Sequence, residues 1–124
     1  MCRIEQADRW NLIHDEHPRA AKEYRCGECG RAIKVGETYE RHSLVHDGEW
    51  DVLRTCEHCQ AARKWLEIEC RGWVYEQVYE ELVEHWYEDL IYRTVWLGRV
   101  IAGMKHRWHD GRIPVPSEPP VLTA

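Results

Sequence analysis

Two cysteine pairs with the same internal spacing are the residues of this sequence best placed to do defined chemistry. They are Cys26-Gly-Glu-Cys29 and Cys56-Glu-His-Cys59. Each pair sets two thiolates about one turn apart, and four thiolates can complete a tetrahedral shell around one Zn²⁺. The sequence therefore predicts one zinc ion held by these four cysteines. Because such a shell leaves no position for water, the predicted role of the ion is structural rather than catalytic.

The segment between the pairs indicates the elements that must position them. Thr38–Val45 has the composition of a strand, Asp47-Gly48 is a strong hairpin-turn signal, and Trp50 lies on the expected return strand. Thr55 is expected to cap a helix that carries the second cysteine pair and ends near Gly72. In the first turn of that helix, thiolates would face the positive end of the helix dipole.

The rest of the chain is expected to be helical and then extended. From Trp73 to Ile91, apolar pairs recur every four residues, and a second periodic set runs from Leu97 to Trp108. This pattern predicts either one long bent helix or a helical hairpin. Four prolines from Pro114 onward predict an extended, mobile tail. The expected organisation is a small α+β protein with a lead-in (1–25), a zinc module (26–72), a helical region (73–109) and a Pro-rich tail (110–124).

Length, charge and apolar pattern narrow the class of protein. The chain has 124 residues, seven Trp, six Tyr and a net charge of −5. It has no run of 18 apolar residues that would predict a membrane span, and no apolar stretch typical of a signal peptide. We therefore expect a cytoplasmic protein, in which thiols stay reduced and paired cysteines bind metal. Cys2 and Cys70 remain unassigned, and Cys70 is expected to be a buried small apolar residue.

The order of knuckle, hairpin and cysteine-bearing helix resembles that of treble-clef zinc fingers. The run from Cys26 to Arg41, together with Thr55-Cys-Glu-His-Cys59 and Trp65-Leu66, is also similar to small proteins of bacteriophages and prophages. The resemblance covers roughly residues 24–75. It implies a viral protein that acts in the host cytoplasm. Because the functions of that group are mostly unknown, it supplies a context rather than a mechanism.

Four-cysteine treble clefs also frame HNH-type nucleases, which makes a nuclease an alternative to a binding protein. Such an enzyme needs a histidine that activates water and further His, Asp or Asn side chains that hold a catalytic metal. The candidates here are His42, His46, Asp47 and His58. However, this chain has His46-Asp47 where such nucleases have Asp followed by His, and its single asparagine, Asn11, lies far upstream. This incomplete set predicts that the protein is not an enzyme, with a degenerate HNH-type nuclease as the less favoured alternative.

The charged and aromatic residues of the helical region are the candidates for a binding surface. Glu76, Glu80, Glu84 and Glu88 form an acidic line beside Trp86. This line could contact a basic surface on a host or phage protein, such as a host defence complex or a protein that acts on nucleic acid. A second set could instead contact nucleic acid. That set consists of the bases Arg93, Arg99, Lys105, Arg107 and Arg112, with Trp96 and Trp108 interleaved. These bases could also pair with the acidic helix of a second chain, which leaves a homodimer open.

Overall fold

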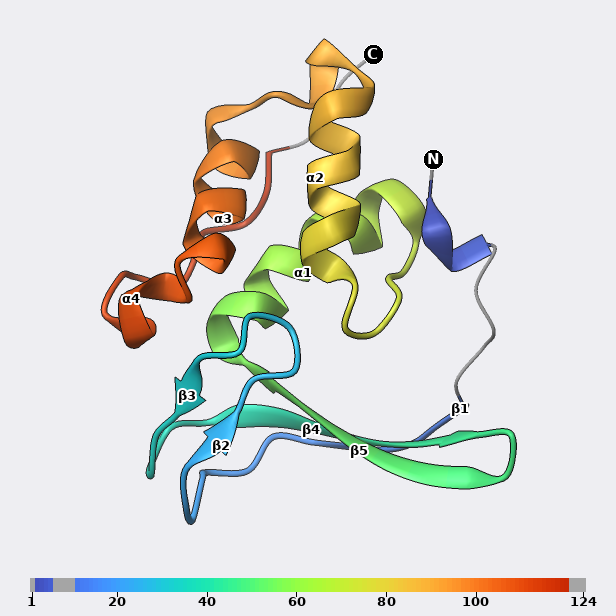
Figure 1. Cartoon of the computed structure of the whole chain (residues 1–124), viewed down its shortest axis with the longest axis vertical. Coiled ribbons are helices and arrows are strands. Elements are labelled where there is room, and N and C mark those ends of the chain that lie inside the picture. Colours follow the sequence, from blue (N-terminus) through green and yellow to red (C-terminus); the bar gives the residue numbers. More distant parts are fainter. Residues whose placement is uncertain (1, 6–10, 121–124) are drawn as a thin grey trace.

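The computed structural model describes residues 2–5 and 11–120 and places a small antiparallel sheet beneath a group of helices (Figure 1). The strands are β1 (Asn11–Glu16), β2 (Tyr24–Arg25), β3 (Ala32–Ile33), β4 (Tyr39–His46) and β5 (Glu49–Cys56). The helices are η1 (Arg3–Glu5), α1 (Glu57–Cys70), α2 (Val78–Glu88), η2 (Leu90–Tyr92), α3 (Val95–Lys105) and α4 (Trp108–Gly111). The protein is thus a mixed α/β structure.

The predicted hairpin is confirmed and forms most of the larger sheet. β4 and β5 pair antiparallel from Tyr39↔Cys56 to His46↔Glu49, and Asp47 and Gly48 make the turn with positive φ angles. The strand order is β1-β4-β5, so residues 11–16 of the expected lead-in belong to the same sheet as the hairpin. β2 and β3 form a separate two-stranded ribbon around the first cysteine pair.

Helix α1 follows β5 directly. Cys56 is its N-cap residue, and no side chain caps the helix. The expectation that Thr55 is the cap is therefore wrong, because Thr55 still belongs to β5 and pairs with Glu40. The helix ends as expected near Gly72: Arg71 adopts the left-handed conformation, and its backbone N–H donates to the carbonyl of Leu66.

The helix expected from Trp73 begins only at Val78, so the prediction is wrong for residues 73–77. Glu76 has a φ of 66°, which interrupts any right-handed helix. Its N–H and that of Val78 donate to the two carboxylate oxygens of Glu28, at 2.8 and 3.2 Å. A side chain 50 positions earlier thus satisfies the free amides at the start of α2, which no local pattern could reveal.

The helical region contains a hairpin of two helices, α2 and α3, rather than one long bent helix. α2 ends where Asp89 becomes extended, and the Asp89 carboxylate accepts from the N–H of Ile91. α3 starts after Thr94, whose hydroxyl accepts from the N–H of Leu97 at 3.1 Å. Leu90, near the end of the apolar series that starts at Trp73, lies in η2 beyond the end of α2, and its side chain is exposed.

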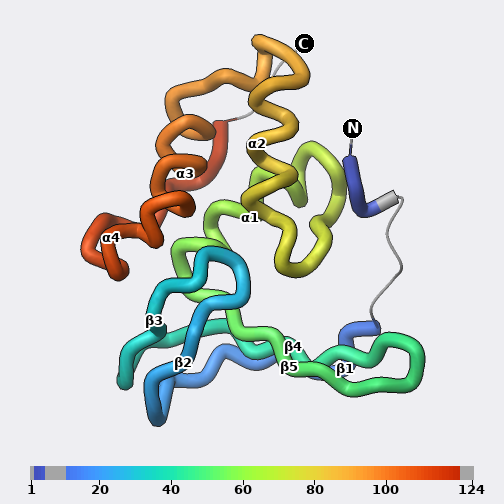
Figure 2. The backbone as a smooth tube through the Cα atoms, viewed as in Figure 1, coloured from blue at the N-terminus to red at the C-terminus, as the bar shows by residue number. Residues whose placement is uncertain are grey.

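Residues 112–120 of the expected extended tail pack on the helices (Figure 2), and residues 121–124 lie outside the described part of the chain. The carbonyl of Ile113 accepts from the His58 ring at 2.6 Å, and that of Ser117 accepts from the Trp96 indole at 3.0 Å. Glu118 pairs with Lys64 on α1. The short α4 before this segment contains left-handed residues and works as a reversing turn.

One apolar core joins the sheet to the helices. Its largest fully buried side chains include Trp65 of α1 and Trp108 of α4. Cys70 is buried as expected, but it forms a disulfide with Cys2 rather than acting only as an apolar residue. None of the helices described in this structure is both long and apolar enough to cross a membrane.

Candidate metal centre

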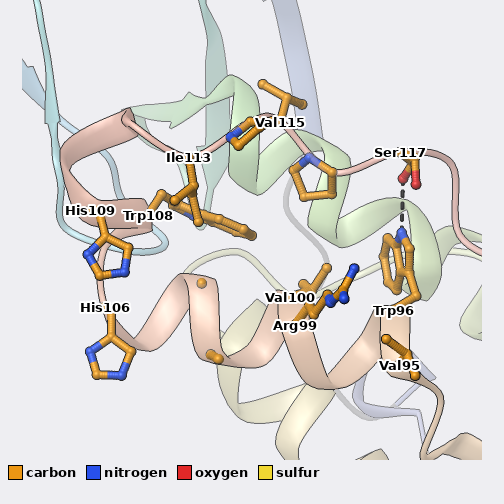
Figure 3. Close-up of a pocket in the computed structure, with 14 residues that line it drawn as sticks. Val95, Trp96, Arg99, Val100, His106, Trp108, His109, Ile113, Val115 and Ser117 are labelled. Atoms are coloured by element: carbon orange, nitrogen blue, oxygen red, sulfur yellow. Dashed lines mark hydrogen bonds between the residues drawn. The ribbon is translucent and has the colours of Figure 1, made fainter.

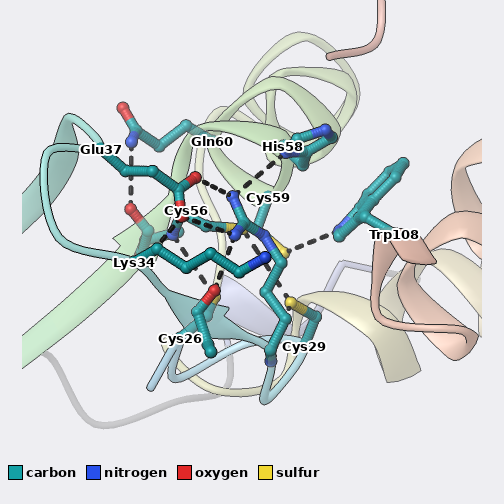
Figure 4. Close-up of polar contacts among 12 residues, drawn as sticks. Cys26, Cys29, Lys34, Glu37, Cys56, His58, Cys59, Gln60 and Trp108 are labelled. Carbon is teal, nitrogen blue, oxygen red and sulfur yellow. Dashed lines mark hydrogen bonds and ion pairs between the residues drawn. The ribbon is translucent and has the colours of Figure 1, made fainter. Parts of the chain in front are cut away.

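The four cysteine sulfurs of the two predicted pairs converge between the β2–β3 ribbon and the start of α1 (Figure 4). All four lie within 4.8 Å of one another, and the Sγ atoms of Cys29 and Cys56 are 3.9 Å apart. Cys26, Cys56 and Cys59 are buried, and Cys29 is half-buried. Four sulfurs at these separations are compatible with a tetrahedral zinc site with Zn–S bonds of about 2.3 Å.

Backbone amides point at the sulfurs and would stabilise thiolates. The N–H groups of Glu28 and Cys56 both donate to Cys26 Sγ at 3.4 Å, and that of Arg31 donates to Cys29 Sγ at 3.5 Å. The tight knuckle that creates this geometry depends on Gly30, whose φ of 80° suits glycine.

Burial raises the pKa of the Glu28 carboxyl to about 7, although its hydrogen bonds from the amides of Glu76 and Val78 act in the opposite direction.

Four thiols this close cannot ionise independently. Hydrogen bonds from Cys26, Cys29 and Cys59 lower the pKa of Cys56, whereas burial raises the pKa of Cys59. The cluster is therefore electrostatically frustrated without a cation, since further negative charge on one sulfur penalises the others. A divalent cation removes the conflict and allows all four cysteines to be thiolates.

Arg31 supplies a positive charge next to the cluster. Its side chain is only 1 % exposed and forms a bidentate pair with Glu37, at 2.9 and 3.2 Å. The guanidinium also lies 3.4 Å from Nδ1 of His58 and interacts with Cys56. Four thiolates and one Zn²⁺ carry a net charge of −2, so Arg31 offsets part of a buried negative charge.

Trp108 is the component of this centre that the sequence did not indicate. Its indole Nε1–H donates to Cys59 Sγ at 3.4 Å, and the side chain is 2 % exposed. The ring fits because residue 103 is glycine: a Cβ there would lie 2.3 Å from Trp108 Cζ3. The prediction that Trp108 belongs to a partner surface is therefore wrong, because the residue is buried against a sulfur. Only the Gly103–Trp108 spacing could have hinted at this packing.

The residues considered for a nuclease lie in three different environments. His42 is buried on β4, where Nε2 is 3.0 Å from Asp15 Oδ1 and Nδ1 is 2.9 Å from the Tyr75 hydroxyl. His46 and Asp47 lie at the far end of the hairpin, 3.6 Å apart. His58 packs on Trp108 beside the cysteines.

The acidic residues predicted for a partner surface do not form one ridge. Glu80, Glu84 and Glu88 are exposed on α2, whereas Glu76 lies before the helix in a left-handed conformation. Glu84 is already paired with Arg3 of η1. Part of the predicted acidic line is thus engaged within the chain.

The basic and aromatic candidates fall on α3 and around a cavity beside it. Arg99, Lys105 and Arg107 are exposed, while Trp86 is half-buried against α3. A cavity of about 640 Å³ between α3 and the C-terminal segment is lined by Trp96 and Arg99, among others (Figure 3). These lining residues are mainly apolar, and the Trp96 indole spans to Ser117 across one end.

Comparisons with protein families, with curated proteins and with solved structures found no match to this chain. The geometry of the site defines a buried cluster of four cysteines with amide and indole donors around it.

Proposed function

We propose that the chain is a non-enzymatic binding protein whose fold is held together by one structural zinc ion. The knuckle, the β4–β5 hairpin and the cysteine-bearing α1 follow one another in the order of a treble-clef zinc finger, and we assign that fold to residues 26–72. In this proposal the ion clamps the hairpin to the first helix. The working surface then lies on the helices that the zinc module supports.

The observation that carries this proposal is an apolar corner patch, formed by Tyr87, Leu90, Ile91 and Val95 where α2 turns into α3. Three of these side chains are almost fully in water, with exposed fractions of 72 % for Tyr87, 74 % for Leu90 and 72 % for Val95. All four lie between Tyr87 and Val95, around the turn that joins α2 to α3 through η2. Adjacent large apolar side chains favour a protein partner, since aromatic and aliphatic anchors dominate binding energy at interfaces.

The charge beside the corner patch suggests the chemistry of the partner. Glu80, Glu88 and Asp89 are exposed on α2 or at its end, whereas Glu84 is already paired with Arg3. A partner with an apolar groove and a basic rim would complement this surface and associate faster at low salt. The resemblance to small phage proteins suggests a host or phage protein in the host cytoplasm. Inhibition of a host defence or nucleic-acid machine is the specific form of the proposal.

The test compares capture of a partner by patch and control variants. Leu90→Asp places a charge in the corner patch, whereas Val35→Asp makes the same change at a side chain that is 68 % exposed outside the patch. The proposal expects wild type and Val35→Asp to retain one stoichiometric protein from host lysate and Leu90→Asp to lose it. Equal capture by all three, or capture by none, would contradict it. If the purified wild-type protein is a dimer and Leu90→Asp is a monomer, the partner at the corner patch is a second copy of this chain.

Nucleic-acid binding through α3 is the second candidate. Arg99, Lys105 and Arg107 are exposed, and within the described part of the chain no carboxylate is within ion-pair distance of them. If these bases contact phosphates, affinity must fall steeply with salt, and Arg107→Ala must reduce the salt slope by about one unit. Lys34→Ala, at an exposed lysine on the zinc module, serves as the matched control. Salt-independent or absent gel shifts would remove this candidate.

A further inference from the structure

A second group of metal-ligating side chains lies at the opposite end of α1 from the four-cysteine cluster. Cys2, Cys70 and His85 place two sulfurs and one ring nitrogen within 4.8 Å of one another. His85 Nε2 is 3.6 Å from Cys70 Sγ and 3.9 Å from Cys2 Sγ. The three residues come from η1's N-terminal side, the end of α1 and the middle of α2, so the fold brings them together across 83 positions.

The orientation of His85 is that of a metal ligand. Its Nδ1 lies 2.7 Å from the backbone carbonyl of Glu81 and donates a hydrogen bond to it. The proton is therefore on Nδ1, and the lone pair of Nε2 points towards the two sulfurs. Ring contacts with Trp65 and Tyr92 hold the imidazole, which is buried. A carbonyl partner on the far nitrogen is the usual support of a metal-bound histidine.

The two cysteine sites place different demands on redox state. Cys2 and Cys70 form a disulfide in the structure, whereas the four-cysteine cluster binds zinc only as free thiolates. A compartment that keeps those four cysteines reduced also favours reduction of an ordinary disulfide. A thiol or phosphine reductant supplies two electrons, two protons are taken up, and the S–S bond becomes two thiols.

We propose that the reduced Cys2–Cys70 pair and His85 bind a second thiophilic divalent ion, with Zn²⁺ as the expected one. Glu81 does not belong to this group of three ligands. It is fully buried one helical turn before His85, and within the described structure its Oε1 has no hydrogen-bond partner. Its Oε2 accepts from the N–H of Val74 at 3.1 Å, which keeps the carboxylate inside the core. Binding releases the two thiol protons to solvent, and the sulfurs separate to become individual ligands.

The experiment counts bound zinc in the full-length chain. Protein treated with a phosphine reductant and equilibrated with Zn²⁺ alone is weighed by native mass spectrometry, next to protein whose Cys2–Cys70 bond is intact. The expected result is two Zn²⁺ per reduced chain and one per oxidised chain. Cys2→Ser, which changes a residue at the edge of the fold, should hold one Zn²⁺ with or without the phosphine reductant. His85→Gln should also hold one Zn²⁺ after reduction, and it serves as the test if Cys2→Ser does not fold.

A matched control excludes the third group of potential ligands, Asp15, Glu40 and His42 on the sheet. His42→Ala should still hold two ions after reduction. One Zn²⁺ per reduced wild-type chain would overturn the proposal, and so would a second ion lost in His42→Ala but kept in Cys2→Ser. Because the stoichiometry is measured without a partner, its failure is distinguishable from a failure of the proposed binding function.

Discussion

The hydrogen bond from Trp108 to Cys59 gives a sharp test of the metal centre. Trp108→Phe keeps an aromatic ring but removes the Nε1–H that donates to Cys59 Sγ at 3.4 Å. A hydrogen bond to a charged group contributes about 1.5–3 kcal/mol. Loss of a partner to a metal ligand weakens metal binding roughly 10- to 100-fold, which agrees with that energy. We therefore expect the zinc Kd of Trp108→Phe to rise by that factor in a competition titration with a chromophoric chelator.

The smaller ring also leaves a cavity, which must be separated from the lost hydrogen bond. Trp65→Phe is the matched control, because Trp65 is equally buried and its Nε1 has no partner in the described structure. Each variant should lose about 1–2 kcal/mol of unfolding free energy from packing. The additional loss of zinc affinity should occur only in Trp108→Phe. Equal zinc affinities of the two variants would refute a role for the indole at the sulfur.

Four further outcomes follow from contacts around the centre. A Gly→Ala change inside a helix normally stabilises it by about 1 kcal/mol. At position 103 the new Cβ would instead lie 2.3 Å from the Trp108 ring. Chemical denaturation of Gly103→Ala should therefore show a loss of about 1–3 kcal/mol of unfolding free energy, and a gain would contradict this packing. Glu28→Ala removes the carboxylate at the start of α2 and should cost about 1–2 kcal/mol, with faster amide exchange in that helix. Burial alone would raise the pKa of Glu37, but hydrogen bonds from Arg31 and the Lys34 amide outweigh it and lower that pKa. Wild type should therefore lose stability relative to Glu37→Gln as the pH falls below about 4.5, whereas parallel pH profiles would exclude this contribution. Chelation of zinc should abolish the cooperative thermal transition seen by near-UV circular dichroism, and an unchanged transition would exclude a structural ion.

The local signals of the sequence predicted the elements around the cysteines and missed the contacts between distant segments. The Asp47-Gly48 turn and the two Cys-x-x-Cys pairs are local signals, and they correctly located the hairpin and the residues of the sulfur cluster. The start of α2 was not predicted because it depends on Glu28, a residue 50 positions before Val78 whose carboxylate accepts hydrogen bonds from the amides of Glu76 and Val78. The burial of Trp108 was missed for the same reason, as periodicity marks an apolar face without identifying what covers it.

The hydrogen bond from Trp108 to Cys59 also affects how the α2–α3 hairpin can separate from α1 by local unfolding. α2 and α3 carry none of the four clustered cysteines, yet the turn that follows α3 contacts the most buried of those sulfurs. Separating this helical hairpin from α1 must break that contact and expose the core that both share. Amides of α3 should therefore exchange with solvent in the same cooperative event as amides of α1, and at a rate that depends on how much zinc is present. Hydrogen exchange in α3, a helix with none of the four clustered cysteines, would then report the occupancy of the four-cysteine centre.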